Sequence, residues 1–403
     1  MSYGGNVPRF FVFEAFVQFY LWMPIWVIYF QQRGLTLTQI GVLDAIGWVL
    51  MAFAEVPTGA FADRLGRKSS LIVGAALLSA SMFALTADVL SPVFVLGFLA
   101  WGVAYTFFSG ADAALLYDSL RAEGRVGDYP RLAGRLMAVQ QTSNGLGALV
   151  GGWVATYDMS LCFTISGACA IAAAAVAATL REPPHRDASA PPSYWRTMVE
   201  AARVAAGRPV VRHLVLLGAT TSVFPFMLAF MALQPYASAV GVAVWTLGPI
   251  VLARSVATVL GSLAAARIAG RVGPGAVLLA SQAAIVLSMW LLAALASPAA
   301  MGLFLVVAMA NGLARPVLSS LLNAEIPSAQ RATIISLQSL LWTILLAVVE
   351  PLVFVVADTI SIAFAIGVAG TVFAAAAALL LALWRWAAIR AASPLRGEAG
   401  PTG

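Results

Sequence analysis

Stretches of about 20 mostly apolar residues follow one another along almost the whole chain. A helix needs about this length to cross the hydrocarbon core of a bilayer. Only 10% of the residues are charged and 61% are hydrophobic, whereas soluble domains carry about 25% charged residues. Because lipid can cover so much apolar surface and water cannot, the sequence predicts an all-α membrane protein. Twelve transmembrane helices are predicted, over residues 9–30, 38–61, 70–88, 92–116, 132–155, 159–180, 211–236, 243–267, 275–296, 299–323, 332–356 and 360–384.

The basic residues predict how these spans are oriented. If the N-terminus lies inside, the inner segments hold 20 of the 23 lysines and arginines. Arg33 is then the basic residue of the outer loops, while Arg254 and Arg315 fall within spans. Because loops rich in Lys and Arg stay on the cytoplasmic side, we expect a multi-pass protein of a cytoplasmic (inner) membrane with both termini in the cytoplasm.

The longest polar segment divides the predicted spans into two sets of six. A second observation supports two related halves, because residues 62–67 share Ala, Gly and Arg with residues 266–271. Repeated halves joined by an inner loop are typical of secondary transporters. The predicted domains are an N-terminal six-helix bundle over 1–180, a cytoplasmic linker over 181–210, a C-terminal six-helix bundle over 211–386 and a cytoplasmic tail over 387–403.

Part of the predicted linker has an amphipathic pattern. Residues 195–208 would form a short helix on the inner membrane surface, with Trp195, Met198 and Val199 toward lipid. The alternative is a flexible linker.

The loop after the second span carries the most specific motif of the chain. Residues 59–68 read Gly-Ala-Phe-Ala-Asp-Arg-Leu-Gly-Arg-Lys, which resembles the G-x-x-x-D-R-x-G-R-[RK] signature of the major facilitator superfamily. In architecture the resemblance covers about residues 9–386. It implies two pseudo-symmetric six-helix bundles that alternate access to a central site, with this loop as a latch on the inner side. The positions that match are Gly59, Asp63, Arg64, Gly66, Arg67 and Lys68.

The chemistry of this loop can be predicted from its residue types. Gly59 would let a neighbouring helix backbone come close, and Gly66 would permit a tight turn. Asp63 would accept charge-assisted hydrogen bonds from arginines and sit against a helix N-terminus. The other interpretation is a basic loop that only sets the topology, and both roles are compatible.

A second family pattern is met in part. The fifth span resembles the antiporter signature g-x-x-x-G-P-x-x-G-G through Gly147, Gly151 and Gly152, but Ala148 stands in place of the proline and Ser143 in place of the first glycine. Glycines at this spacing allow close helix packing. The fourth span lacks the buried arginine that the family often links to proton coupling.

Ionisable side chains within spans indicate a pathway or a relay, because they are costly in hydrocarbon. The resemblance implies that spans one, four, seven and ten line the central cavity. The residues expected there are Glu14, Gln18, Asp112, Phe224, Gln234, Asn311 and Arg315. The other ionisable residues within spans are Asp44, Glu55, Arg254 and Glu350.

Glu14 is the residue expected to couple transport to protons. A carboxylate in a medium of low dielectric takes up a proton more readily than one in water. The alternative is an ion pair with Arg315 that stabilises one state. Asp118 is expected at the surface near the inner end of the fourth span, and Glu55 and Asp112 are candidates for the inner gate with Arg64.

These observations predict a secondary active transporter, most simply one that exports small hydrophobic or amphiphilic compounds in exchange for protons. The alternative is a transporter of a defined metabolite or a lipid, by symport or facilitated diffusion. No His or Cys cluster or nucleophile motif favours an enzyme, and no cofactor or metal is expected. The expected partners are a small-molecule substrate, protons and the lipid bilayer, with no nucleic acid, and the chain is expected to be a monomer.

Overall fold

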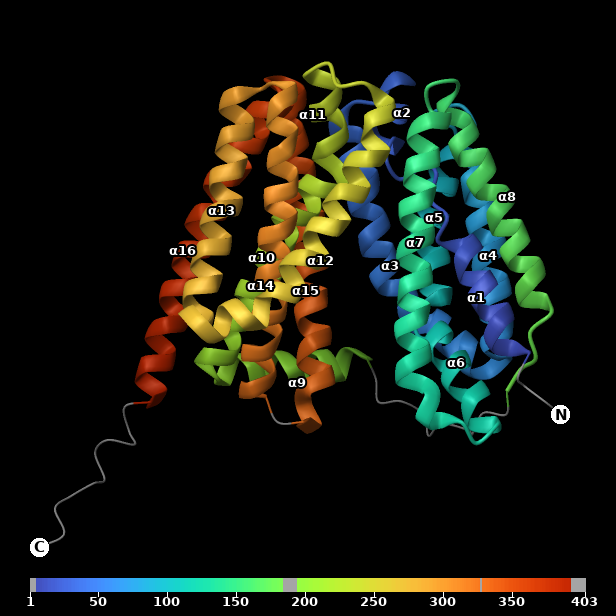
Figure 1. Cartoon of the computed structure of the whole chain (residues 1–403), viewed down its shortest axis with the longest axis horizontal. Coiled ribbons are helices and arrows are strands. Elements are labelled where there is room, and N and C mark those ends of the chain that lie inside the picture. The colour runs from blue at the N-terminus through green and yellow to red at the C-terminus, as the bar shows by residue number, and fades with distance from the viewer. Residues whose placement is uncertain (1–4, 184–193, 327, 393–403) are drawn as a thin grey trace, which may run out of the picture. The chain divides into compact units, whose positions relative to one another are not determined.

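The computed structural model describes residues 5–183, 194–326 and 328–392, and all regular elements in these ranges are helical. The chain forms two compact units. Unit 1 comprises Met1–Pro191 with Ala237–Ala253, and unit 2 comprises Pro192–Tyr236 with Arg254–Gly403. Each unit is built from long helices (Figure 1).

Unit 1 packs its helices around α4. This helix lies against α5 and α8, while α1 packs on α7 and α8, and α3 packs on α5. The helices of this unit are α1 (Asn6–Val17), α2 (Trp26–Gln32), α3 (Leu37–Leu65), α4 (Arg67–Ala84), α5 (Pro92–Phe108), α6 (Ala111–Ala122), η1 (Val126–Asp128), α7 (Tyr129–Val154) and α8 (Met159–Ala178), with η3 (Val244–Thr246) and the start of α12 (Leu247–Val272).

Unit 2 has its core between α10, α13, α14, α15 and α16. Pro225 lies inside α10 and is followed by a π-helical turn, η2, as expected where a proline disturbs the backbone hydrogen bonds of a helix. The helices are α9 (Tyr194–Gly207), α10 (Pro209–Met227), η2 (Leu228–Ala232), α11 (Leu233–Ala239), the rest of α12, α13 (Pro274–Leu295), η4 (Pro298–Gly302), α14 (Leu303–Glu325), α15 (Ser328–Thr359) and α16 (Ile362–Ala392).

Each of the twelve predicted spans coincides with helical structure. In the described ranges, nine helical segments are long and apolar enough to cross a membrane, and one of them, Pro92–Ala122, combines α5 and α6. The other three predicted spans depart from that standard for identifiable reasons. The first is broken into α1 and α2, α4 begins with the charged pair Arg67 and Lys68, and α7 carries Gln140, Gln141 and Asn144.

The first and fourth spans are discontinuous, which the hydropathy pattern does not predict. The first loses helical geometry between Gln18 and Ile25. The fourth breaks at Ser109 and Gly110, where Gly110 has a φ of +76°. Breaks of this kind recur in transporters, where they place backbone polar groups at a binding site instead of in lipid.

The glycines of α7 make room for the first break. A Cβ atom at Gly147 would lie 2.6 Å from the backbone nitrogen of Tyr20, and one at Gly151 would overlap the carbonyl oxygen of Leu21. The hydroxyl of Ser166 on α8 accepts a 3.3 Å hydrogen bond from the Leu21 N–H. The expected close packing at these glycines is therefore packing against an unwound backbone.

The third glycine of this pattern serves another contact of unit 1. Gly152 faces Gly248 in the first turn of α12, and a Cβ at Gly152 would lie 3.0 Å from the backbone nitrogen of Gly248. The pattern thus packs α7 closely on two different segments.

The amphipathic segment forms α9, but its buried face differs from the expectation. Met198 is buried, as are Ala201 and Ala205, which belong to the hydrophobic core of unit 2. The prediction that Met198 faces lipid is wrong, because α9 lays this face on α10 and α15 (Figure 1). Val199 is exposed, and the side chain of Trp195 lies outside the described residues.

We expect Gly151→Ala to destabilise the protein. The added methyl would overlap the carbonyl oxygen of Leu21, and overpacking of this kind costs about 1–3 kcal/mol. The matched control is Gly134→Ala on the same helix, where a Cβ would meet no atom within 4 Å and alanine favours the helix. Thermal unfolding in detergent should show a lower midpoint for Gly151→Ala only. Equal midpoints would contradict the packing described above.

Candidate functional site

A buried carboxylate lies one turn before the break in the first span. Glu14 on α1 is 3% exposed, and its Oε2 accepts a 2.9 Å hydrogen bond from Nε2 of Gln140 on α7. The ion pairs found within the described part of unit 1 do not include Glu14. A buried acid whose hydrogen-bond donor is a neutral amide can be accommodated in both the charged and the protonated form.

Aromatic side chains surround the break itself. Tyr20 packs on Trp22 and on Tyr105 of α5, with ring centroids 5.3 and 6.1 Å away. Trp22 meets Trp101 of α5 edge to face at 4.5 Å. We call Glu14, Gln18 and Gln140 with these four aromatic residues the helix-break site. It combines a few polar groups with a large apolar surface, a composition common in sites for small molecules.

The predicted gate motif forms an ion-pair network in unit 1. Nη1 of Arg67 lies 3.1 Å from Oδ1 of Asp63, one turn earlier on α3. Nε of the same guanidinium lies 3.3 Å from Oδ2 of Asp118 on α6. Asp118, which the sequence places at the surface, is only 15% exposed in its side chain. That expectation is wrong, because Asp118 joins the inner end of α6 to the loop between α3 and α4.

A second carboxylate, which lies more than a hundred residues later in the sequence, also binds this loop. The two oxygens of Glu182, just after α8, accept hydrogen bonds of 2.7 and 2.8 Å from the backbone N–H groups of Arg67 and Lys68. These are the first residues of α4, whose N–H groups have no partner within the helix. The expected partner of this helix end was Asp63, but Glu182 takes that role.

Gly66 is required by this arrangement. Its φ of +96° lies in the left-handed half of backbone space, and a Cβ there would lie 2.6 Å from the carboxyl carbon of Glu182. The expected tight turn is therefore confirmed. Gly59 behaves differently, because a Cβ there would meet no atom within 4 Å, so the expectation of a close helix contact at Gly59 is wrong.

The other gate candidates are not joined to this network. Arg64 and Glu55 are exposed, and the ion pairs that the gate motif makes within the described residues involve Arg67 instead of Arg64. Asp112 lies in the first turn of α6 and accepts a hydrogen bond from the N–H of Ala113. It follows the break at Gly110 as Glu14 precedes the break in the first span.

The candidates of unit 2 fall into different environments. Phe224 is 2% exposed and packs 4.8 Å from Phe373 of α16. It fills the interior of this unit, whereas the sequence predicts it in the wall of a central cavity. Gln234 is buried, Asn311 is half-buried and Arg315 is exposed. Glu14 and Gln18 lie one turn apart at the end of α1, while the unit 2 candidates differ in their burial.

The remaining intramembrane charges differ in their surroundings. Asp44 accepts a 2.7 Å hydrogen bond from Nε1 of Trp48, one turn later on α3, which accounts for one carboxylate oxygen. Glu350 is 0% exposed in α15. The Nε atom of Arg254 is buried and has no hydrogen-bond partner in the described part of the chain. In the described ranges, no group of three or more His, Cys, Asp or Glu residues is placed to hold a metal ion.

Sequence reasoning missed Gln140, Asp118 and Glu182. Gln140 carries a weak signal, since a glutamine within a span has to find a polar partner. The other two lie far in sequence from the residues they bind, so no local pattern reveals them.

Comparisons with known proteins agree with this geometry. The model of the Major Facilitator Superfamily matches residues 10–349, while no curated protein sequence matches the chain. The nucleoside transporter NupG is similar in structure, with a TM-score of 0.73 at 17% identity, covering 94% of this chain and 99% of that one. A D-xylose-proton symporter has a TM-score of 0.69 at 14% identity, with coverage of 95% and 98%.

A third solved structure is a bacterial homologue of the human lysosomal transporter Spinster in an inward-facing conformation. Its TM-score is 0.69 at 15% identity, and the match covers 95% of each chain. At these identities the likeness establishes the fold.

The two glycines of the gate motif should respond oppositely to alanine. Gly66→Ala places a side chain in a backbone region that is nearly restricted to glycine, which costs about 1–3 kcal/mol, and it displaces Glu182. Gly59→Ala should keep or slightly raise stability, because the position is open and helical. Thermal unfolding of both variants in detergent tests this, and a loss at Gly59 equal to that at Gly66 would contradict it.

Proposed function

The chain belongs to the major facilitator superfamily, and we propose that this membrane transporter exports small hydrophobic or amphiphilic compounds in exchange for protons by alternating access. The substrate would bind at the helix-break site of unit 1. Glu14 would carry the proton, and the loop between α3 and α4 would act as the inner gate.

The observation that supports proton coupling is the environment of Glu14. It is 3% exposed, and its carboxylate accepts a hydrogen bond from the neutral amide of Gln140. Ionisation of a carboxylate is penalised when it is removed from water without a cation beside it. A change in exposure during transport would therefore change its proton occupancy. The predicted ion pair between Glu14 and Arg315 is the competing proposal.

The composition of the helix-break site supports an amphiphilic substrate. Tyr20, Trp22, Trp101 and Tyr105 offer aromatic surface, and Gln18 is half-buried beside the break. Aromatic faces attract both apolar groups and organic cations. A sugar would call for a denser set of hydrogen-bonding side chains.

Arg254 supports a second candidate, a defined metabolite that carries a carboxylate or a phosphate. Its buried Nε lacks a hydrogen-bond partner in the described residues, and a cation within a span indicates a pathway by default. An anionic substrate group would supply the missing acceptor, by symport or facilitated diffusion.

The proposed setting follows from the charge distribution of the sequence. The transporter would lie in the cytoplasmic membrane with both termini in the cytoplasm and work as a monomer. Its partners would be the substrate, protons and lipid.

Proteoliposomes with an imposed pH gradient test the proposal. The substrate panel consists of lipophilic cations, neutral dyes, nucleosides, D-xylose and organic anions. Gradient-driven movement of a cation or dye should fall at least tenfold in Glu14→Gln, which cannot exchange a proton, while exchange of substrate without a gradient continues. The control Glu55→Gln removes an exposed carboxylate of the second span and should retain gradient-driven movement.

Three outcomes would decide between the proposals. Persistence of substrate-linked proton movement in Glu14→Gln would remove Glu14 from the coupling mechanism. Transport of an organic anion only, lost in Arg254→Gln, would favour the metabolite transporter. A folded Asp63→Asn protein that binds substrate but transports it slowly would support the gate, because Asp63 pairs with Arg67.

A further inference from the structure

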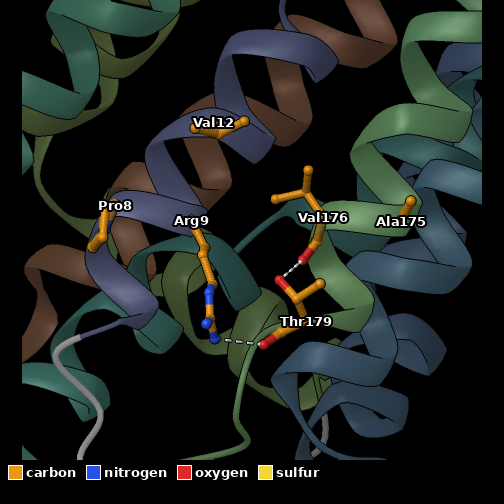
Figure 2. Close-up of a pocket in the computed structure, with 6 residues that line it drawn as sticks. All are labelled: Pro8, Arg9, Val12, Ala175, Val176 and Thr179. Carbon is orange, nitrogen blue, oxygen red and sulfur yellow. Dashed lines mark hydrogen bonds between the residues drawn. The ribbon is translucent and has the colours of Figure 1, made fainter.

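A groove on the outside of unit 1 lies between the inner ends of the first and sixth spans. It has a volume of about 490 Å³ and runs between α1 and α8. Figure 2 shows Pro8, Arg9 and Val12 on α1 and Ala175 and Val176 on the adjacent α8, all of which line the groove. Val12 is 46% exposed, and an exposed apolar side chain on a membrane-spanning helix faces lipid.

A second, polar pocket adjoins the groove and shares Arg9 with it. This pocket has a volume of about 220 Å³ and is lined by Gly5, Asn6, Arg9 and Arg181. Arg9 reaches across from α1, and its Nη1 donates a 2.9 Å hydrogen bond to the carbonyl oxygen of Thr179 (Figure 2). The two pockets together join a strip of apolar wall to a pair of arginines.

The polar pocket is built by a buried side chain. Asn6 is 1% exposed. Its amide donates hydrogen bonds to Oγ of Ser119 and to the carbonyl oxygen of Arg181, and it accepts one from the Arg181 N–H. Through these bonds Asn6 fixes the backbone of Arg181 near Arg9. The fold thus places the backbone of Arg181 and, through its bond to Thr179, the guanidinium of Arg9 beside the same pocket.

The acidic residue that follows Arg181 in sequence is engaged at the start of another helix. Glu182 directs its carboxylate to the backbone N–H groups of Arg67 and Lys68 at the start of α4. Arg9 uses one guanidinium nitrogen for Thr179 within the described residues, and a guanidinium has five N–H donors. The remaining donors can bind the oxygens of a phosphate.

We propose that this composite groove binds one anionic phospholipid of the inner leaflet, with its phosphate between Arg9 and Arg181 and an acyl chain along Val12, Ala175 and Val176. Arg9 and Arg181 lie at the ends of spans that the charge pattern assigns to the cytoplasmic side, where anionic lipids gather. The apolar strip selects a lipid over a free anion, because a small anion leaves it uncovered. The bound lipid would hold α1, the helix that carries Glu14, against α8.

Binding is measured on the full-length chain in detergent by native mass spectrometry. The probes are dioleoylphosphatidylglycerol, dioleoylphosphatidylcholine and glycerol 3-phosphate. We expect one tightly retained phosphatidylglycerol and at least tenfold weaker retention of phosphatidylcholine. Glycerol 3-phosphate in millimolar excess should not displace the anionic lipid. No transport is measured, so the result is independent of the proposed substrate and of proton coupling.

Two classes of variant test the binding of the phosphate headgroup and the binding of the acyl chain separately. Arg9→Gln with Arg181→Gln should weaken retention of phosphatidylglycerol by at least tenfold, since each basic residue at an anionic surface contributes roughly a fivefold effect. Val12→Trp should fill the groove and weaken retention of both lipids. The matched controls are Arg135→Gln and Leu161→Trp, which change exposed residues outside the two pockets and should leave retention unchanged.

Folding is checked separately by thermal unfolding without added lipid. A variant that unfolds as the wild type does but loses the stabilisation that phosphatidylglycerol gives would support the site. Equal retention of phosphatidylglycerol by the wild type, the double arginine variant and Val12→Trp would overturn the proposal. Displacement by glycerol 3-phosphate would also overturn it, because the pocket would then be an anion site and not a lipid site.

Discussion

Where a helix is interrupted inside a membrane, the protein has to supply hydrogen-bond partners for the backbone N–H and C=O groups that the break exposes, and this constraint determines how unit 1 is packed. Lipid offers no hydrogen bonds to the groups that a break exposes. In the first span the N–H of Tyr20 bonds the carbonyl of Gln18, the N–H of Ile25 bonds that of Trp22, and Leu21 donates to Ser166 on α8. The glycines of α7 then let the unwound segment lie directly against a helix backbone. The aromatic rings of Tyr20, Trp22 and Trp101 also pack on one another at the break.

One face of α7 supports both the break and the buried acid. Gln140, Gly147 and Gly151 are spaced by seven and four residues, so they share one side of the helix. Gln140 reaches Glu14 before the break, while the two glycines receive the backbone after it. A shift of α7 along α1 would therefore disturb the hydrogen bond to the carboxylate and the packing of the unwound turn together. The partial antiporter pattern marks this shared face, and not only a close contact of two helices.

The sequence predicts the spans well because hydropathy over 20 residues is a property of the local chain. It misses the break within residues 9–30, because apolar composition is the same in a helix and in an unwound segment held by neighbours. It assigns Asp118 to the surface because its partner Arg67 lies 51 residues away. The partnership of Glu182 with α4 spans 115 residues. For Met198 the pattern correctly gives an apolar face, but an amphipathic helix can lay that face on protein as readily as on lipid.

Where α1 begins, two pairs of adjacent residues tie the loop between α3 and α4, the proposed gate, to the first span. Asp118 binds Arg67 in the gate loop, and its neighbour Ser119 accepts a hydrogen bond from the first residue of α1. Glu182 caps α4, and the backbone of its neighbour Arg181 bonds that same residue of α1. The two residues of each pair are joined by one peptide bond, so a displacement of one displaces the other. A movement of the loop between α3 and α4 would therefore act on the start of α1 through both pairs. The helix that begins at this junction carries the buried carboxylate two turns further on, so the loop between α3 and α4 and the helix-break site share one helix within unit 1.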